Sequence, residues 1–206
     1  SVDPLSATMT STPSAGCAVS RMRSRHARSR SASSRTGMMN EITGRPRILV
    51  FNWCYHGTVD ECFITRQDDG TSRARSGNIG PPVDPSVTTK VVEFNDVEAL
   101  EAALAPGDVA CVLAEPAMTN VGIVHPEPGY HAALRELTRK HGTLLIIDET
   151  HTICAGPGGM TRAEKLEPDI LVFGKAIGGG IPGAAYGFTR EVASRDCSAS
   201  WRTSIA

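Results

Sequence analysis

Three side chains that can carry acid–base or nucleophilic chemistry stand at the ends of apolar runs in this sequence. Lys175 follows the run ILVF by one residue and shortly precedes three glycines, Asp148 directly follows LLII, and Glu115 directly follows VACVLA. Short continuous apolar runs are typical of buried strands, and a charge at the mouth of such a strand is costly to bury without a partner. Glycines let other groups come close. We therefore expect a functional site where these strands end.

Lys175 and Asp148 form the pair with the most specific chemistry. They are 27 residues apart (175 − 148), one strand–helix–strand step, so neighbouring strand ends can bring them into one pocket. Burial lowers the pKa of a lysine and makes its amine a nucleophile that condenses with aldehydes. Pyridoxal phosphate is the main biological aldehyde held in this way, and its ring nitrogen needs an acidic partner. The spacing by itself fits a structural salt bridge equally well.

The elements that must position these residues alternate between apolar strands and amphipathic helices. One helix is expected in NDVEALEAALAPG, with Asn95 as N-cap three residues before Glu98, and another in PEPGYHAALRELTRKHG, which Gly142 ends. The alternation predicts an α/β fold with a mostly parallel sheet covered on both faces, a three-layer αβα arrangement. Ligands of such sheets bind beyond the carboxyl ends of the strands. The expected strands are 48–51, 90–94, 109–114, 144–147, 170–173 and 184–188.

Bulk composition excludes several classes of protein. The 206 residues are 40% hydrophobic and 21% charged, and no apolar run approaches the ~20 residues of a membrane-spanning helix. The six cysteines are scattered, without a C-x-x-C pair or a secretory signal, so we expect no disulfide framework and no metal site, and favour the cytoplasm. Cys54 and Cys111 lie in apolar runs and are expected in the core. Four histidines are interpreted as surface or turn residues: His125, His131, His141 and His151.

Five blocks in order carry a family resemblance. They are RILVFNWCYHGTVDE, VLAEPAMTNVG, LLIIDETHT, AGPGGMTRA and PDILVFGKAIGGGIPGAAYGF. Together they resemble the class III aminotransferases, which are fold-type-I enzymes dependent on pyridoxal 5'-phosphate. The resemblance is strongest to the branch that includes glutamate-1-semialdehyde 2,1-aminomutase. It implies the large domain of the PLP-transferase fold and amino transfer between substrates or within one molecule.

The resemblance also implies roles for the strand-end pair. Lys175 matches the lysine that forms the internal Schiff base and then moves the proton between substrate and cofactor. Asp148 matches the carboxylate that pairs with the pyridinium nitrogen. Small-molecule amino acid or amine substrates and a homodimer are implied as well, with neither nucleic acid nor membrane as a partner.

Five further residues match cofactor-binding positions of the family. Asn120 matches the group that hydrogen-bonds the phenolic oxygen, Tyr55 of the YHG motif matches the aromatic that stacks on the ring, and His56 completes that motif. Thr150 matches the residue against the opposite ring face, and Glu115 the one that organises the pocket. From the residues alone, Tyr55 can equally be an ordinary half-buried aromatic, and Asn120 and Thr150 can be caps of turns.

The two flanks depart from the family. Residues 1–42 are rich in serine and arginine, and residues 1–40 carry a net charge of +5 (six arginines, one aspartate), so we expect disorder. A solvated tail, a transit peptide and a nucleic-acid arm are alternative interpretations of this tract.

Residues 43–193 are expected to form a partial PLP-binding large domain, followed by an unrelated tail, 194–206. The phosphate-binding segment and the small C-terminal domain of the family are absent, which suggests a frame disruption or gene fragment. The alternative function is an inactive fragment or a half-site that needs a complementing chain.

Overall fold

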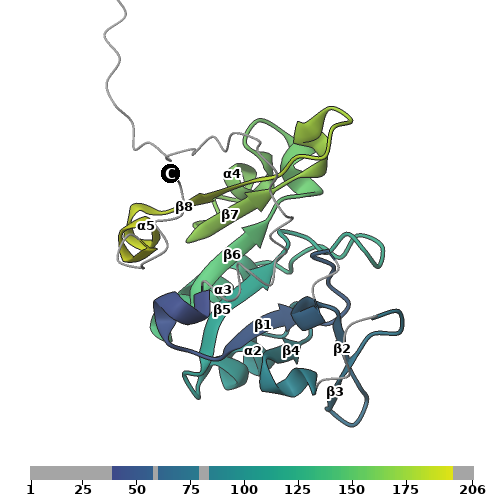
Figure 1. Cartoon of the computed structure of the whole chain (residues 1–206), viewed down its shortest axis with the longest axis vertical. Coiled ribbons are helices and arrows are strands. Elements are labelled where there is room, and N and C mark those ends of the chain that lie inside the picture. Colours follow the sequence, from purple (N-terminus) through teal and green to yellow (C-terminus); the bar gives the residue numbers. More distant parts are fainter. Residues whose placement is uncertain (1–38, 58–59, 79–83, 197–206) are drawn as a thin grey trace, which may run out of the picture.

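The computed structural model describes residues 39–57, 60–78 and 84–196, which form a twisted six-stranded sheet with helices packed against it (Figure 1). The strand order is β4-β1-β5-β6-β7-β8. Neighbouring strands are parallel except for β8, which runs antiparallel to β7. The strands are β1 (Arg47–Phe51), β4 (Thr89–Val92), β5 (Val109–Ala114), β6 (Leu144–Asp148), β7 (Ile170–Phe173) and β8 (Ala185–Phe188). The predicted α/β class with a mostly parallel sheet is confirmed.

Helices and short turns connect the strands. The two longest, α2 and α3, pack against each other and against β4 and β6 respectively. Both were predicted, whereas the hairpin of β2 and β3 and the short helices α4 and α5 were not. The helices are α2 (Val97–Leu104), α3 (Tyr130–Lys140), α4 (Gly159–Ala163) and α5 (Arg190–Asp196), and the hairpin strands are β2 (Ile64–Arg66) and β3 (Ser72–Ala74). Single 3₁₀ turns lie at Asp60–Cys62, Pro85–Val87, Thr152–Ala155 and Lys175–Gly178.

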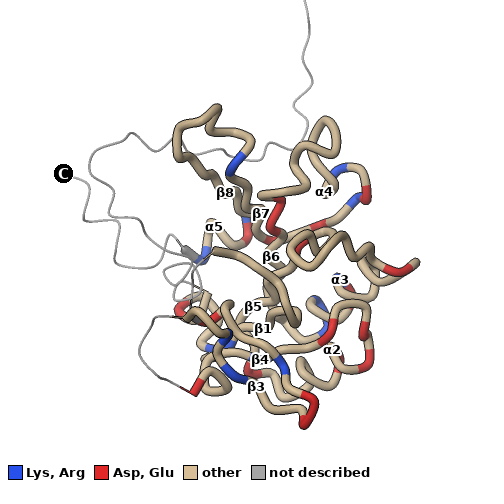
Figure 2. The backbone as a smooth tube through the Cα atoms, turned by 90° about the vertical axis from the view of Figure 1, so that its right-hand side faces the viewer, with Lys and Arg blue, Asp and Glu red and all other residues tan. Residues whose placement is uncertain are grey.

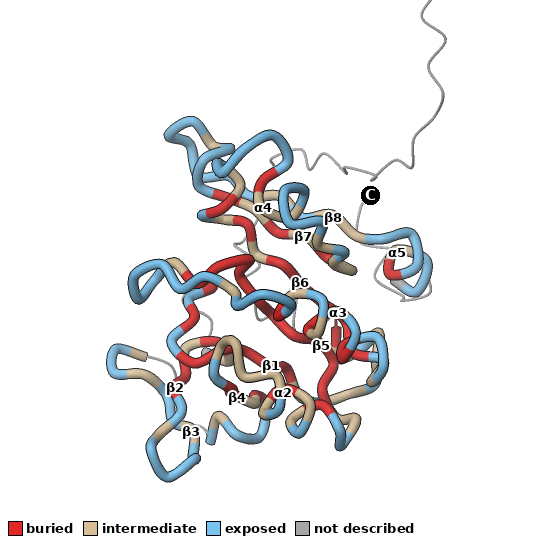
Figure 3. The backbone as a smooth tube through the Cα atoms, turned by 180° about the vertical axis from the view of Figure 1, so that it is seen from behind, coloured by how far each residue is buried: buried red, intermediate tan, exposed pale blue. Residues whose placement is uncertain are grey.

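The core lies between the centre of the sheet and α2 and α3 (Figure 3). Every residue of β5 is buried, as its uninterrupted apolar sequence predicts for a central parallel strand. Phe51, Phe94 and Tyr130 meet edge to face, with ring centroids 4.8 to 6.2 Å apart. Cys54 and Cys111 are buried in this core, which confirms their prediction as small apolar residues.

The N-cap of α2 is Asp96 and not Asn95, so the predicted capping box is wrong by one residue. The Asp96 carboxylate accepts a hydrogen bond from the Ala99 amide at 2.8 Å. Asn95 instead adopts φ 72°, a left-handed conformation that asparagine tolerates better than most residues. Its side-chain amide donates to the His125 carbonyl at 3.0 Å and accepts from the Glu127 amide at 2.9 Å. Asn95 therefore anchors the loop that precedes α3.

The boundary predicted for the disordered segment is also wrong. Residues 39–43 are helical, and Met39 is fully buried in the core, although we expected disorder through residue 42. Residues 1–38 and 197–206 lie outside the described residues, and so do the predictions made for them. At the other end α5 continues past residue 193, and its Val192 is buried.

Charged residues of both signs are interspersed over the described part of the chain (Figure 2). Asp108 accepts hydrogen bonds from both Arg47 and Lys90, each at 2.6 Å, which ties β1 and β4 to the start of β5. Arg135 of α3 forms a bidentate ion pair with Asp169, in which Nη1 donates to Oδ2 at 2.8 Å and Nη2 donates to Oδ1 at 2.9 Å. Within the described residues, no helix is long and apolar enough to cross a membrane.

Candidate active site

A cavity of about 360 Å³ opens at the carboxyl ends of β5, β6 and β7. Sheet register explains why the predicted residues meet there. Ala114 of β5 lies opposite Ile147 of β6, so Glu115 and Asp148 follow at the same level. The lining residues are Tyr55, His56, Gly57, Glu115, Asp148, Thr150, His151, Val172, Phe173, Gly174, Lys175, Gly183 and Ala184. Of the predicted site residues, Asn120 alone does not line the cavity, and it is exposed.

Asp148 is paired with His56 and not with Lys175. The His56 Nδ1 and Asp148 Oδ2 atoms are 2.8 Å apart, and the two side chains are 2% and 11% exposed. Burial works to lower the pKa of His56, but Cys54 and the Asp148 carboxylate outweigh it and raise that pKa to about 10. Burial works to raise the pKa of Asp148, but His56 and Thr150 outweigh it and lower that pKa to about 2. The cavity thus holds a permanently ionised carboxylate at neutral pH.

The His56–Asp148 pair predicts a specific pH dependence of stability. The contribution of His56 is full below pH 6.5 and is lost as pH rises through about 10. The contribution of Asp148 is full above pH 3.8 and is lost as pH falls through about 2. We therefore expect His56→Gln to lower the free energy of unfolding by roughly 2 kcal/mol at pH 5 and by much less above pH 10.

Urea denaturation followed by circular dichroism between pH 4 and 10.5 measures this difference. His125→Gln, at an exposed loop histidine, is the matched control and should follow the unmodified chain at every pH. A loss in His56→Gln that is constant across the whole range would show that the pair is not the source of the effect.

Lys175 begins the 3₁₀ turn that follows β7, at the place the sequence predicted. Its φ of 44° is a left-handed conformation that is strained for a residue with a Cβ, and strain of this kind concentrates at functional sites. Burial of Lys175, which we expected, is not found, because the residue is exposed. Its Nζ lies 2.5 Å from His151 Nε2, so a direct salt bridge to Asp148 is also wrong. A specific partner, and not burial, holds this amine.

His151 and Thr119 are the residues of the cavity region that sequence reasoning missed. His151 lies in the turn after β6 and is exposed, as predicted for a surface histidine, yet its ring reaches Lys175. Its Nδ1 is 2.5 Å from the Thr119 hydroxyl, which is also 2.6 Å from Glu115 Oε2. Glu115 is only 7% exposed. The sequence feature that could have placed His151 in the cavity region was its position three residues after Asp148.

Thr150 and Tyr55 occupy two further sides of the cavity. The Thr150 amide donates to Asp148 Oδ1 at 2.9 Å, which is the capping role left open by the sequence. Tyr55 is 37% exposed and meets Phe63 edge to face at 6.2 Å. Its exposed ring belongs to the wall of the cavity that holds His56.

The cavity residues fit a flat aromatic aldehyde with a ring nitrogen. Gly174 lines this space, and a Cβ at this position would make only ordinary van der Waals contacts, 3.6 Å from the Gly183 carbonyl and 3.8 Å from the Thr150 hydroxyl. An amine, Lys175, and an ionised carboxylate, Asp148, face the same space. The three glycines that follow Lys175, residues 178–180, do not line the cavity, whereas Gly183 and Ala184 do. Among the described residues, no group of three or more His, Cys, Asp or Glu side chains could hold a metal ion.

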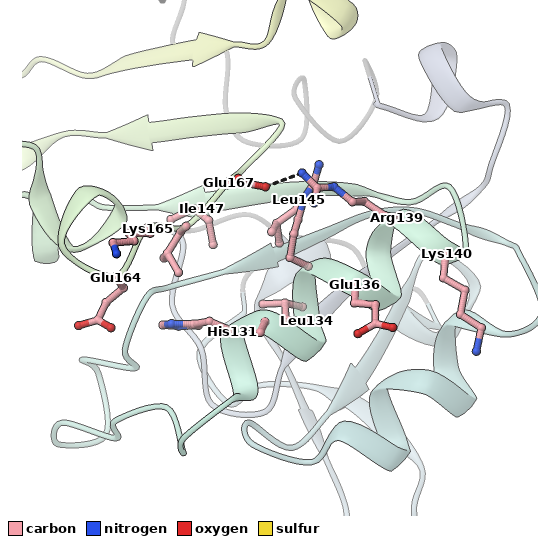
Figure 4. Close-up of a pocket in the computed structure, with 13 residues that line it drawn as sticks. His131, Leu134, Glu136, Arg139, Lys140, Leu145, Ile147, Glu164, Lys165 and Glu167 are labelled. Atoms are coloured by element: carbon pink, nitrogen blue, oxygen red, sulfur yellow. Dashed lines mark hydrogen bonds and ion pairs between the residues drawn. The ribbon is translucent and has the colours of Figure 1, made fainter.

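A larger hollow of about 680 Å³ lies away from the strand ends, between α3, β6 and the segment after α4 (Figure 4). Its floor contains Leu134, Leu145 and Ile147, and its rim carries the ion pair of Arg139 with Glu167 at 2.5 Å. None of the predicted site residues lines it. Size alone therefore does not identify the site, whereas the convergence of ionisable groups at the strand ends does.

Comparisons with known proteins identify the family of this chain. The aminotransferase class-III family profile matches residues 15–203, a range that extends beyond residues 43–193 on both sides. Glutamate-1-semialdehyde 2,1-aminomutase of Sulfurihydrogenibium azorense is 40% identical over 153 residues, which cover 73% of this chain and 36% of that protein. The chain thus spans little more than a third of the length of such relatives.

Solved structures give the same result. A glutamate-1-semialdehyde-aminomutase from Pseudomonas aeruginosa PAO1 is 51% identical with a TM-score of 0.77, and the match covers 80% of this chain and 36% of that one. A second structure of that aminomutase is in complex with PMP. An omega-transaminase from Sphaerobacter thermophilus is 32% identical with a TM-score of 0.71, covering 80% and 39% of the two chains. The chain belongs to the aminotransferase class-III family.

Proposed function

We propose that this chain carries the cofactor-binding core of a pyridoxal-phosphate-dependent enzyme that transfers amino groups. The observation that supports the proposal best is the meeting of Lys175 and Asp148 in one cavity at the ends of adjacent parallel strands. Bound pyridoxal phosphate would supply an electron-accepting ring beside the amino carbon of the substrate. Membership of the family favours this function over the alternative of an inactive fragment.

Each cavity residue has a part in this proposal. Lys175 provides the amine that anchors the cofactor and carries a proton to and from the substrate carbon. Asp148, kept ionised by His56, holds a proton on the ring nitrogen. Tyr55 and Thr150 bound the ring, and Asn120 hydrogen-bonds the phenolic oxygen, which requires it to turn from its exposed position.

The substrates and the assembly belong to the same proposal. We propose a small amino acid or amine as substrate, a homodimer, and a cytoplasmic location. Residues 43–193 then act as part of a PLP-binding large domain. Relatives named as an aminomutase and as a transaminase leave two reaction types, amino transfer within glutamate-1-semialdehyde or between two substrates.

Cofactor binding and its site test the proposal directly. Addition of pyridoxal 5'-phosphate to the full chain should give a visible absorption band, and borohydride reduction should fix the label on Lys175, as located by peptide mass spectrometry. Turnover of glutamate-1-semialdehyde compared with that of ordinary amine donors then separates the two reaction types. A colourless mixture, or labelling of other lysines without labelling of Lys175, would refute the proposal.

A further inference from the structure

We propose that His151 accepts the proton that Lys175 must lose before its amine can attack an aldehyde, and that Thr119 and Glu115 hold His151 in the competent tautomer. The inference rests on the proposed function, because it concerns the activation of the same lysine. It assigns a catalytic role to His151, which touches the reacting nitrogen, and positioning roles to Thr119 and Glu115. Four side chains from three separate segments form one continuous line of hydrogen bonds.

The chemistry of the four groups allows only one direction for this line of bonds when Lys175 is charged. An ammonium group has donors and no acceptor, so Lys175 Nζ donates to His151 Nε2 over 2.5 Å. Neutral His151 then carries its hydrogen on Nδ1, which donates to the Thr119 hydroxyl over 2.5 Å. The Thr119 hydroxyl donates to Glu115 Oε2 over 2.6 Å. Each bond of the line therefore has one donor and one acceptor, and the lone pair of Nε2 faces the lysine.

Glu115 anchors the far end of the line in the interior. The carboxylate is 7% exposed, and its Oε2 also accepts from the Thr119 backbone amide at 3.2 Å. Its Oε1 is buried without a hydrogen-bond partner among the described residues. Two hydrogen bonds to one buried carboxyl oxygen thus fix the Thr119 hydroxyl that faces His151. The nucleophile Lys175 is therefore next to a base, His151, and this base is oriented through Thr119 by the carboxyl group of Glu115, as in other activated nucleophiles.

The proposed step is a single proton transfer that balances. The N–H bond of the Lys175 ammonium breaks and leaves the electron pair on Nζ, while the Nε2 lone pair of His151 takes the proton. The products are a neutral amine and an imidazolium whose Nδ1–H still points at Thr119. Because His151 is exposed, its proton can pass on to water.

Other titratable groups also face His151 and enter its pH response. Asp148 and His56 line the same cavity, and they are held by each other. The Cys154 thiol donates to the His151 backbone carbonyl at 3.2 Å and leaves the ring free to act. The pH response of Lys175 is therefore expected to depend on His151, Thr119 and Glu115 in particular.

The tautomer of His151 is the first test, and it needs no cofactor. Long-range ¹H–¹⁵N spectra of the full chain with labelled histidine, assigned with His151→Gln, should show the hydrogen on Nδ1. Thr119→Val, which keeps the shape and removes the hydroxyl, should abolish this preference, and Thr119→Ser should keep it. A hydrogen on Nε2 in the unmodified chain would overturn the proposal.

The pH profile of Lys175 reactivity is the second test. Labelling with pyridoxal and borohydride is followed at each lysine by mass spectrometry from pH 6 to 11, with exposed Lys165 as the reference within the same molecule. At pH 7, His151→Ala and Thr119→Val should slow labelling of Lys175 roughly tenfold or more, the low end for loss of a general base. The difference should vanish near pH 11, where lysine is uncharged without help. Thr119→Ser and His125→Ala should match the unmodified chain.

The outcomes separate this inference from the proposed function. Equal labelling of Lys175 in all variants, with the same pH profile, would refute the role of His151 and leave the proposed function standing. A defect that persists at pH 11 would make His151 a structural residue only, and the inference would again be wrong. No labelling of Lys175 in any variant, while Lys165 reacts, would refute the proposed function itself.

Discussion

Replacement of Lys175 by arginine is expected to abolish covalent attachment of pyridoxal 5'-phosphate and to lower amino transfer by at least about 10³-fold. Both effects have one cause, since the variant loses the attacking amine and the group that moves the proton. Arginine keeps the positive charge and the length of the side chain, but its guanidinium is not deprotonated in proteins. Loss of charge at the cavity is therefore excluded as the explanation.

Borohydride reduction, peptide mapping and a transamination assay measure the outcome. Lys165→Arg is the matched control, because Lys165 is exposed and lines the other hollow of the chain, and it should behave as the unmodified protein. Non-covalent binding of the cofactor should survive in Lys175→Arg, since Asp148 and His56 are untouched. Undiminished amino transfer in Lys175→Arg would refute the assignment of Lys175 as the lysine that binds the cofactor and transfers the proton.

Glu149→Ala is expected to lower the free energy of unfolding by roughly 3–5 kcal/mol, because several donors lose one shared acceptor. The side chain is fully buried. Its carboxylate accepts from the Thr152 hydroxyl at 2.5 Å, from the Met160 amide at 3.3 Å and from the Thr161 amide. These bonds tie the 3₁₀ turn after β6 and the start of α4 to one carboxyl group, and alanine leaves the donors without a partner. Urea denaturation and the thermal midpoint measure the loss.

Two companion variants keep this prediction specific. Glu164→Ala, at an exposed glutamate in the same region, should change the free energy of unfolding by less than about 0.5 kcal/mol. Gly159→Ala should be strongly destabilising as well, because φ is 65° and the added Cβ would lie 2.7 Å from both Glu149 oxygens. Equal stability of Glu149→Ala and Glu164→Ala would show that the carboxylate does not hold this segment.

The pairing of functional side chains escaped the sequence for a definite reason. Asp148 and Lys175 were correctly expected near each other, but each has a histidine as its partner. His56 is 92 residues from Asp148 in the chain, and His151 is 24 residues from Lys175. The local sequence pattern does not indicate which of the histidine side chains lie in the cavity. The exposure of Lys175 was not predicted. The apolar strand before Lys175 does not indicate whether other segments cover the turn that Lys175 begins.

The sequence by itself determined the strands, the two long helices and the edge at which the ionisable groups gather. Continuous apolar runs such as Val109–Ala114 are typical of strands buried in a parallel sheet, and parallel strands end at a common edge, so Glu115, Asp148 and Lys175 were expected to meet. The tertiary structure alone decided which group each of them touches. Hydrogen-bond partners depend on distances of a few tenths of an ångström between distant segments, and only the packed fold sets these.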